Sequence, residues 1–175
     1  LWMGRSLWGM ILRDDLLAFD DLLSRSEIDS SRVGVTGISM GATRAWWLLA
    51  LEERLKAGVA VACMTRYQNL ILSESLLAHG IYYFVPGLLS SYDTEAIVSL
   101  AAPRPLLFLT GDSDPGSPVD GMRIIADKAQ SIFDLYGKPD MFQSVIFKDT
   151  GHSYLPEMWS RMLEWMDRHV KGGMG

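Results

Sequence analysis

The pentapeptide at 37–41, Gly-Ile-Ser-Met-Gly, places Ser39 between two glycines. A serine hydroxyl is a weak nucleophile, so it needs an exposed position, a base and donors for the oxyanion that its attack creates. A G-x-S-x-G sequence between an apolar strand and a helix is typical of a sharp turn that exposes such a serine, and its glycines leave room where a side chain would clash. Here the run 32–36 precedes the turn and the Ala-, Leu- and Trp-rich run 42–53 follows it. This context indicates a nucleophile rather than a plain glycine-rich turn.

The same turn supplies electrostatic help. A helix that begins after Ser39 points its positive end at the negative charge that develops on the attacked carbonyl oxygen. The backbone N–H of Met40 then becomes one donor of an oxyanion hole.

A carboxylate and a histidine follow in the order that a catalytic triad needs. Asp112 and Asp114 come after the apolar run 106–110, and His152 comes after the run 144–147. The histidine would accept the proton of Ser39, and the carboxylate would hold the imidazole in the correct tautomer. We favour Asp114 as the acid, because it lies in a loop stiffened by two prolines, and keep Asp112 as the alternative. Either carboxylate could instead only cap N–H groups of a turn.

The remaining reactive side chains carry weaker signals. His79 could line a pocket or be an ordinary loop histidine, and His169 closes the last helix, where a structural role is expected. Cys63 ends an apolar run and is expected to be buried and inert.

Composition excludes several classes of protein. Hydrophobic residues make up 49% of the 175 residues and charged residues 21%, which is ordinary for a packed domain and excludes a disordered chain. The net charge of −5, without a basic run, speaks against nucleic acid as a partner. Apolar runs such as 45–51 are too short to cross a bilayer, so no membrane is expected. No Cys/His cluster and no Gly-rich phosphate loop is present, so we expect neither a zinc site nor a nucleotide-binding site.

Helices and strands alternate along the chain. The hydrophobic pattern predicts strands over 32–36, 58–63, 106–110 and 144–147, and helices over 7–25, 42–53, 94–101, 119–135 and 156–170. This alternation predicts an α/β fold, a parallel sheet with flanking helices, in a single domain over 1–175.

The segment 64–93 is predicted to be irregular, and it is rich in aromatic residues. A long apolar connection of this kind is more often functional than accidental, so we expect a cap-like insertion over the site. Tyr82, Tyr83 and Phe84 would then be walls of a substrate pocket, although plain core packing explains them equally well.

The chain resembles the α/β-hydrolase superfamily, and within it the branch of dienelactone hydrolase-like and acetyl xylan esterase-like proteins. The matching segments are residues 4–9, 14–15, 33–41, 102–107, 111–114 and 151–152. The resemblance implies hydrolysis of carboxylic esters without a metal or organic cofactor. Carried over by position, it implies Ser39 as nucleophile, Asp114 as acid, His152 as base and the N–H of Met40 as an oxyanion donor.

The superfamily fold has eight strands, and the four predicted here match the last four. The N-terminal strands, with the loop that supplies the second oxyanion N–H, are expected to be missing. One edge of the strand before Ser39 would then be bare, and a bare apolar edge invites pairing with another chain. We therefore expect a two-fold homodimer, or else that residues 1–8 fold back over the edge.

Three functions fit these observations. The leading one is a serine hydrolase that cleaves small carboxylic esters through an acyl-enzyme on Ser39. The alternatives are a peptidase of the prolyl-oligopeptidase type, which shares the turn and the triad order, and a non-catalytic interaction domain that kept only half of the site.

Overall fold

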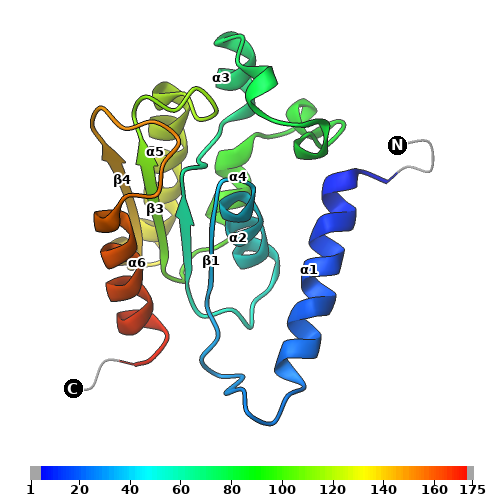
Figure 1. Ribbon diagram of the computed structural model, residues 1–175, viewed down its shortest axis with the longest axis vertical. Coiled ribbons are helices and arrows are strands. Elements are labelled where there is room, and N and C mark those ends of the chain that lie inside the picture. Colours follow the sequence, from blue (N-terminus) through cyan, green and yellow to red (C-terminus); the bar gives the residue numbers. More distant parts are fainter. Residues whose placement is uncertain (1–4, 173–175) are drawn as a thin grey trace.

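The computed structural model describes residues 5–172, and within them the centre is a parallel sheet of four strands (Figure 1). The strands are β1 (Val35–Ile38), β2 (Gly58–Val61), β3 (Leu106–Gly111) and β4 (Phe142–Phe147). They lie side by side in the order in which they occur along the chain, each parallel to the next. Parallel strands that alternate with helices define the α/β class, so the predicted fold class is confirmed.

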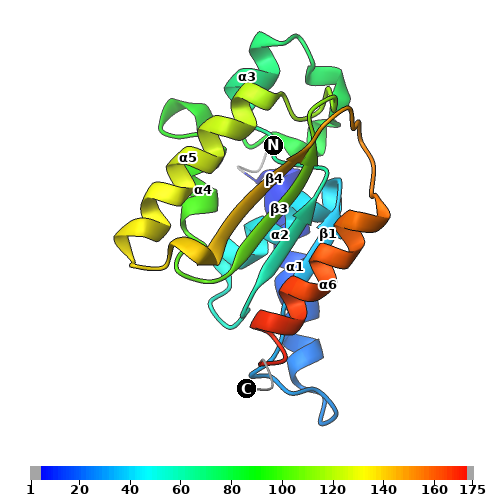
Figure 2. The same cartoon turned by 90° about the vertical axis from the view of Figure 1, so that its left-hand side faces the viewer.

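Helices cover both faces of the sheet (Figure 2). α2 (Met40–Leu51), α4 (Thr94–Ser99) and α5 (Val119–Leu135) lie on one face, and α6 (Pro156–His169) lies on the other. β2 and β3 are buried along their whole length, as strands covered on both faces must be. Successive side chains of β3 enter opposite cores: Phe108 packs on the α2–α5 side, whereas Leu107 and Leu109 pack on the α6 side.

The bounds of some helices and strands agree closely with those predicted from the sequence, and those of others agree less closely. α5 spans the predicted residues, but the first strand begins at Val35, later than predicted, and continues to Ile38. The late start follows from Asp29, whose carboxylate accepts the N–H of Ser31 at 3.0 Å and the Nε–H of Arg32 at 2.6 Å. These bonds hold the preceding residues in a turn.

The first helix, α1 (Leu7–Leu23), is attached to α2 rather than laid over the sheet edge. The indole of Trp8 is 1% exposed and contacts the rings of Trp47, Tyr82 and Tyr83. Arg44 of α2 binds both carboxylate oxygens of Asp15. The alternative that residues 1–8 cover the β1 edge falls partly on residues 1–4, which lie outside the described part of the chain. Of the described residues, Trp8 packs on α2 and not on β1.

The segment 64–93 contains more regular structure than the sequence predicts. It holds the helix α3 (Tyr67–Leu72) and three 3₁₀ turns, at Leu76–Ala78, Ile81–Tyr83 and Leu88–Ser90. The segment lies beyond the carboxyl ends of the strands (Figure 1). Helices and turns this short have no readable periodicity, which is why the pattern of apolar residues did not reveal them.

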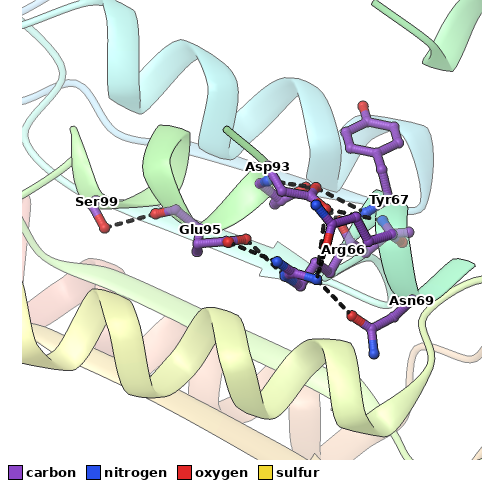
Figure 3. A network of polar contacts seen from close by, with 9 residues as sticks. Arg66, Tyr67, Asn69, Asp93, Glu95 and Ser99 are labelled. Atoms are coloured by element: carbon purple, nitrogen blue, oxygen red, sulfur yellow. Dashed lines mark hydrogen bonds and ion pairs between the residues drawn. The ribbon is translucent and has the colours of Figure 1, made fainter. Parts of the chain in front are cut away.

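A buried carboxylate ties this segment to α4 (Figure 3). Asp93 accepts the N–H groups of Tyr67 and Gln68 at 2.9 Å and that of Thr94 at 2.7 Å, so it caps the start of both α3 and α4. Arg66 lies beside it, 3.9 Å from Asp93 Oδ2, and donates two hydrogen bonds to Glu95. The segment is therefore anchored at both of its ends.

β1 is an edge strand of the described sheet. The burial of its side chains alternates, and Ile38 is 40% exposed on the side where α6 covers β2 and β3 but not β1.

Among the described residues, no helix is both long and apolar enough to cross a membrane.

Candidate active site

Ser39 stands at the corner between β1 and α2 in a strained backbone conformation, with φ 58° and ψ −124°. A positive φ at a residue other than glycine costs on the order of 1–3 kcal/mol, so the neighbouring structure must impose it. Two backbone bonds do so: Ser39 N–H donates to Val61 at 2.9 Å, and Ser39 O accepts the N–H of Thr43 at 3.1 Å. A Cβ at Gly37 would overlap the carbonyl group of Gly41, so the close turn requires glycine there. A Cβ at Gly41 would meet no atom within 4 Å, so space explains only the first glycine.

An unsatisfied donor adjoins the serine. Met40 is the first residue of α2, where backbone N–H groups have no acceptor within the helix. In the described part of the chain its N–H donates to no other group. The N–H and the positive end of α2 are thus both available beside the Ser39 side chain.

Asp114 and His152 form a directly bonded pair. His152 Nδ1 donates to Asp114 Oδ2 at 2.8 Å, and Asp114 Oδ1 accepts the N–H of Gly116 at 2.9 Å. The Asp114 side chain is 3% exposed, whereas that of His152 is 45% exposed. Because an ionised carboxylate only accepts, the proton sits on Nδ1 and leaves Nε2 of a neutral ring as an acceptor.

Asp112, the alternative acid, is engaged elsewhere. Its carboxylate accepts the hydroxyl of Ser113 at 2.9 Å and the N–H of Thr150 at 3.3 Å. It therefore caps the turn between the strand ends, as the second interpretation of these carboxylates expected.

The bonded pair and the serine open onto the same cavity, which has a volume of about 260 Å³. Its lining residues are Ser39, Ala62, Ala78, His79, Tyr82, Asp114, Pro115, Gly116, Ser117 and His152. Within the described residues no hydrogen bond joins Ser39 Oγ to His152; such contacts often tighten only when substrate is bound. The carboxyl ends of β1, β3 and β4 thus bring the three predicted side chains to one place.

The three aromatic residues predicted as pocket walls lie in three different surroundings. Tyr82 lines the cavity, but Tyr83 is fully buried, and its ring stacks on His79 with centroids 4.1 Å apart. Phe84 lines a different, apolar hollow of about 120 Å³, together with Tyr67. Because the 3₁₀ turn Ile81–Tyr83 rotates successive side chains away from one another, the three cannot share one wall.

His79 lies at the cavity, where the sequence left two interpretations open. Its Nε2 is 2.8 Å from the carbonyl oxygen of Gly116, and burial lowers the pKa of its imidazole. The sequence offers one signal for it, a titratable ring within the mainly apolar stretch 76–85, but nothing that identifies its neighbours.

Cys63 and His169 do not line the cavity that holds Ser39. Cys63 is buried against the hydroxyl of Thr43, and burial raises the pKa of its thiol, as expected for an inert cysteine. His169 packs on Trp165, and burial lowers the pKa of its imidazole. Over residues 5–172, no group of three or more His, Cys, Asp or Glu side chains is placed to hold a metal ion.

The described chain superposes on solved structures of esterases and of a peptidase. The chain superposes on Methylesterase BT1017 with a TM-score of 0.73 at 23% identity, covering 94% of this chain and 36% of that one. It superposes on a glucuronoyl esterase from Solibacter usitatus with a TM-score of 0.69 at 20% identity, covering 89% and 47%. The acylaminoacyl peptidase of Pyrococcus horikoshii gives a TM-score of 0.68 at 18% identity, covering 94% and 28%. At these identities the likeness concerns the fold alone, and it agrees with the α/β fold predicted from the sequence.

Sequence relatives point to a family within that superfamily. The protein named "Putative hydrolase YtaP" of Bacillus subtilis (strain 168) is 36% identical over 152 residues, which cover 87% of this chain and 50% of that protein. The chain thus spans about half the length of this curated relative. Residues 3–173 match the prolyl oligopeptidase family, the group that the sequence analysis names as the peptidase alternative. With nearly its whole length matched, the chain belongs to the prolyl oligopeptidase family.

Proposed function

We propose that this chain carries the nucleophile, acid and base of a serine hydrolase that cleaves small carboxylic esters. The observation that carries the proposal is the shared cavity, into which Ser39 opens together with the bonded pair of Asp114 and His152. The hydrolase name of the Bacillus subtilis relative and the esterase names of the solved structures support the same class.

In the proposed reaction, Nε2 of His152 takes the proton of the Ser39 hydroxyl as the oxygen attacks the ester carbonyl. The oxyanion accepts a hydrogen bond from the N–H of Met40. The imidazolium, stabilised by Asp114, then protonates the departing alkoxide, and an acyl group stays on Ser39 Oγ. Water, deprotonated by His152, attacks the acyl carbonyl; the bond to Ser39 Oγ then breaks, His152 returns the proton to Oγ, and the acid is released. Tyr82 and Ala78, which line the cavity, would contact the acyl or alcohol group.

A peptidase is the second candidate, and the family match favours it. The same acyl-enzyme chemistry would then act on an amide, with His152 protonating a departing amine. The small cavity suits short acyl groups better than an extended peptide, which is why we place the ester first.

Turnover of the purified 175-residue chain distinguishes these functions. We expect hydrolysis of p-nitrophenyl acetate by the wild type and its loss in Ser39→Ala. Methyl and glucuronoyl esters, suggested by the names of the solved structures, and N-acyl amino-acid p-nitroanilides complete the panel. Cleavage of the anilides alone would favour the peptidase. Equal rates for wild type and Ser39→Ala on every compound would overturn both candidates and favour a non-catalytic domain.

A further inference from the structure

We propose that His79 is a positioning residue of this site, which holds the Asp114 loop in place through the backbone of Gly116. This inference rests on the proposed function, because it concerns how the acid of that site is oriented. It gives the segment 64–93 a role in aligning the acid.

The argument begins at the loop between β3 and α5. Asp114 uses one carboxylate oxygen for His152 and the other for the N–H of Gly116. The orientation of the Asp114 side chain therefore depends on where the Gly116 backbone lies. Gly116 is also closely fitted between two side chains, since a Cβ there would lie 3.2 Å from Asp114 Oδ1 and 3.3 Å from His79 Nε2.

The carbonyl oxygen of Gly116 is held from the other side. It accepts the hydroxyl of Thr65 at 2.6 Å and lies 2.8 Å from Nε2 of His79. Because a carbonyl oxygen can only accept, His79 must carry its proton on Nε2. Thr65 Oγ1 and His79 Nε2 lie 3.4 Å apart because both donate to this one carbonyl oxygen. Their approach is therefore not a further hydrogen bond.

The neighbouring bonds agree with these directions. Ser117 Oγ accepts the N–H of Met64 at 3.2 Å, and its own proton is directed to Thr65 Oγ1 at 3.0 Å. That leaves the Thr65 proton for Gly116, so every donor in the cluster has an acceptor.

The ring of His79 is itself fixed. It lies nearly parallel to the ring of Tyr83, at 10° and with centroids 4.1 Å apart, and Tyr83 is fully buried. Burial lowers the pKa of His79, so the ring is neutral near pH 7 and offers one defined N–H. A flat, fixed donor that faces the Gly116 carbonyl suits the positioning of a backbone group better than the capture of a variable substrate.

The resulting chain of contacts runs from His79 to Gly116, Asp114 and His152. Loss of the His79 donor would leave the Gly116 carbonyl held by Thr65 alone, so that the loop and the Asp114 carboxylate are held less firmly. Small misplacements of catalytic groups lower the rate of the chemical step by up to about 100-fold. The effect should fall on kcat and leave KM nearly unchanged, because the N–H of His79 is directed to the Gly116 carbonyl rather than to the substrate.

Two substitutions separate the donor from the ring. His79→Phe keeps an aromatic ring against Tyr83 but removes the N–H, whereas His79→Gln keeps a donor at the reach of Nε2 and removes the ring. We expect His79→Phe to lower kcat for p-nitrophenyl acetate about 10- to 100-fold, with KM unchanged within about threefold, and His79→Gln to recover most of it. Circular dichroism and thermal melting confirm that both variants fold.

A second readout does not depend on turnover, so it separates failure of this inference from failure of the proposed function. Long-range ¹H–¹⁵N spectra at about pH 8, above the ordinary histidine pKa, report which ring nitrogen carries the proton. In the wild type we expect the proton on Nε2 of His79 and on Nδ1 of His152. In His79→Gln, which lacks the first ring, we expect His152 to keep its proton on Nδ1. In His79→Phe, His152 should become a mixture of tautomers.

Three results would overturn the inference. An Nδ1–H tautomer of His79 in the wild type would do so without any variant. Unchanged kcat and an unchanged His152 tautomer in His79→Phe would show that the donor holds nothing. Equal losses of kcat in both variants would assign the effect to the ring and its stacking rather than to the hydrogen bond.

Discussion

Trp8 in the first helix stacks on Tyr82, a wall of the cavity that holds Ser39, with ring centroids 6.4 Å apart. The indole is almost fully buried, so its removal would leave a large void. We expect Trp8→Ala to lower the free energy of unfolding by about 3 kcal/mol or more, measured by urea denaturation. Trp159→Ala is the matched control, because that side chain is 52% exposed, and it should cost about 0.5 kcal/mol. Equal costs would contradict the packing described for α1.

The pairing of His152 with Asp114, and the turn bonds of Asp112, lead to opposite expectations for two similar substitutions. Asp114→Asn should favour the wrong imidazole tautomer and lower kcat for p-nitrophenyl acetate about 10⁴-fold, by analogy with other serine hydrolases. Asp112→Asn should change kcat by no more than about twofold. The reverse ranking would assign the acid to Asp112.

Asp93 should be far more important for stability than its exposed counterpart Asp29. Asp93→Ala leaves the N–H groups of Tyr67, Gln68 and Thr94 without their acceptor. Arg66 then keeps only the carboxylate of Glu95 as a neighbouring charge. We expect a loss of about 3 kcal/mol in the free energy of unfolding. Asp29 makes a similar number of bonds in solvent, so Asp29→Ala should shift the urea midpoint little. A large shift for Asp29→Ala alone would contradict the burial argument.

Stability should decline in mild acid because of two partly buried histidines. Burial lowers the pKa of His79 and of His169 below the ordinary value of 6.5. The unfolded chain therefore binds more protons than the folded chain between the two pKa values, and stability rises with pH in that window. It is fully present above about pH 6.5 and is lost as the pH falls through the lowered folded pKa. Urea denaturation from about pH 7.5 to about pH 5.5 should show this slope, and His79→Gln should show a shallower one. Parallel slopes would remove His79 as a cause.

The exposed edge of β1 leads to a proposal about assembly. Because Ile38 is partly exposed beside an edge that has no neighbouring strand in the described sheet, we propose that the chain forms a two-fold homodimer through this edge. Sedimentation equilibrium should show twice the chain mass of 19.5 kDa. A monomer at that mass throughout the micromolar range would refute the proposal.

The parallel sheet could be predicted from the sequence, and so could the side chains of Ser39, Asp114 and His152 that follow its strands. β3 and α5 appear almost where predicted, because a continuous apolar run and a long amphipathic pattern each determine one kind of element. The start of β1 was misplaced, because Asp29 competes for the residues before it through side-chain bonds that periodicity does not register.

The segment 64–93 shows what the sequence could not supply. Nothing in the order Tyr82, Tyr83, Phe84 tells which ring faces a cavity, because the answer depends on a 3₁₀ turn whose position is set by tertiary contacts. The contact of His79 with Gly116 joins residues 37 positions apart. Such a contact follows from the tertiary fold and leaves no trace in the local sequence.

The edge position of β1 should be visible in amide hydrogen exchange. In a parallel pair, alternate residues of an edge strand donate inward, and here Val35 and Ser39 donate to Ala57 and Val61 of the adjoining chain segment. The N–H groups of Thr36 and Ile38 therefore point to the open side, and in a monomer they should exchange with solvent much faster than those of Val35 and Ser39. A chain that pairs with this edge would slow the exchange of Thr36 and Ile38 while leaving their neighbours unchanged. The two amides on either side of Gly37 thus report, residue by residue, whether the strand that leads to Ser39 has one neighbour or two.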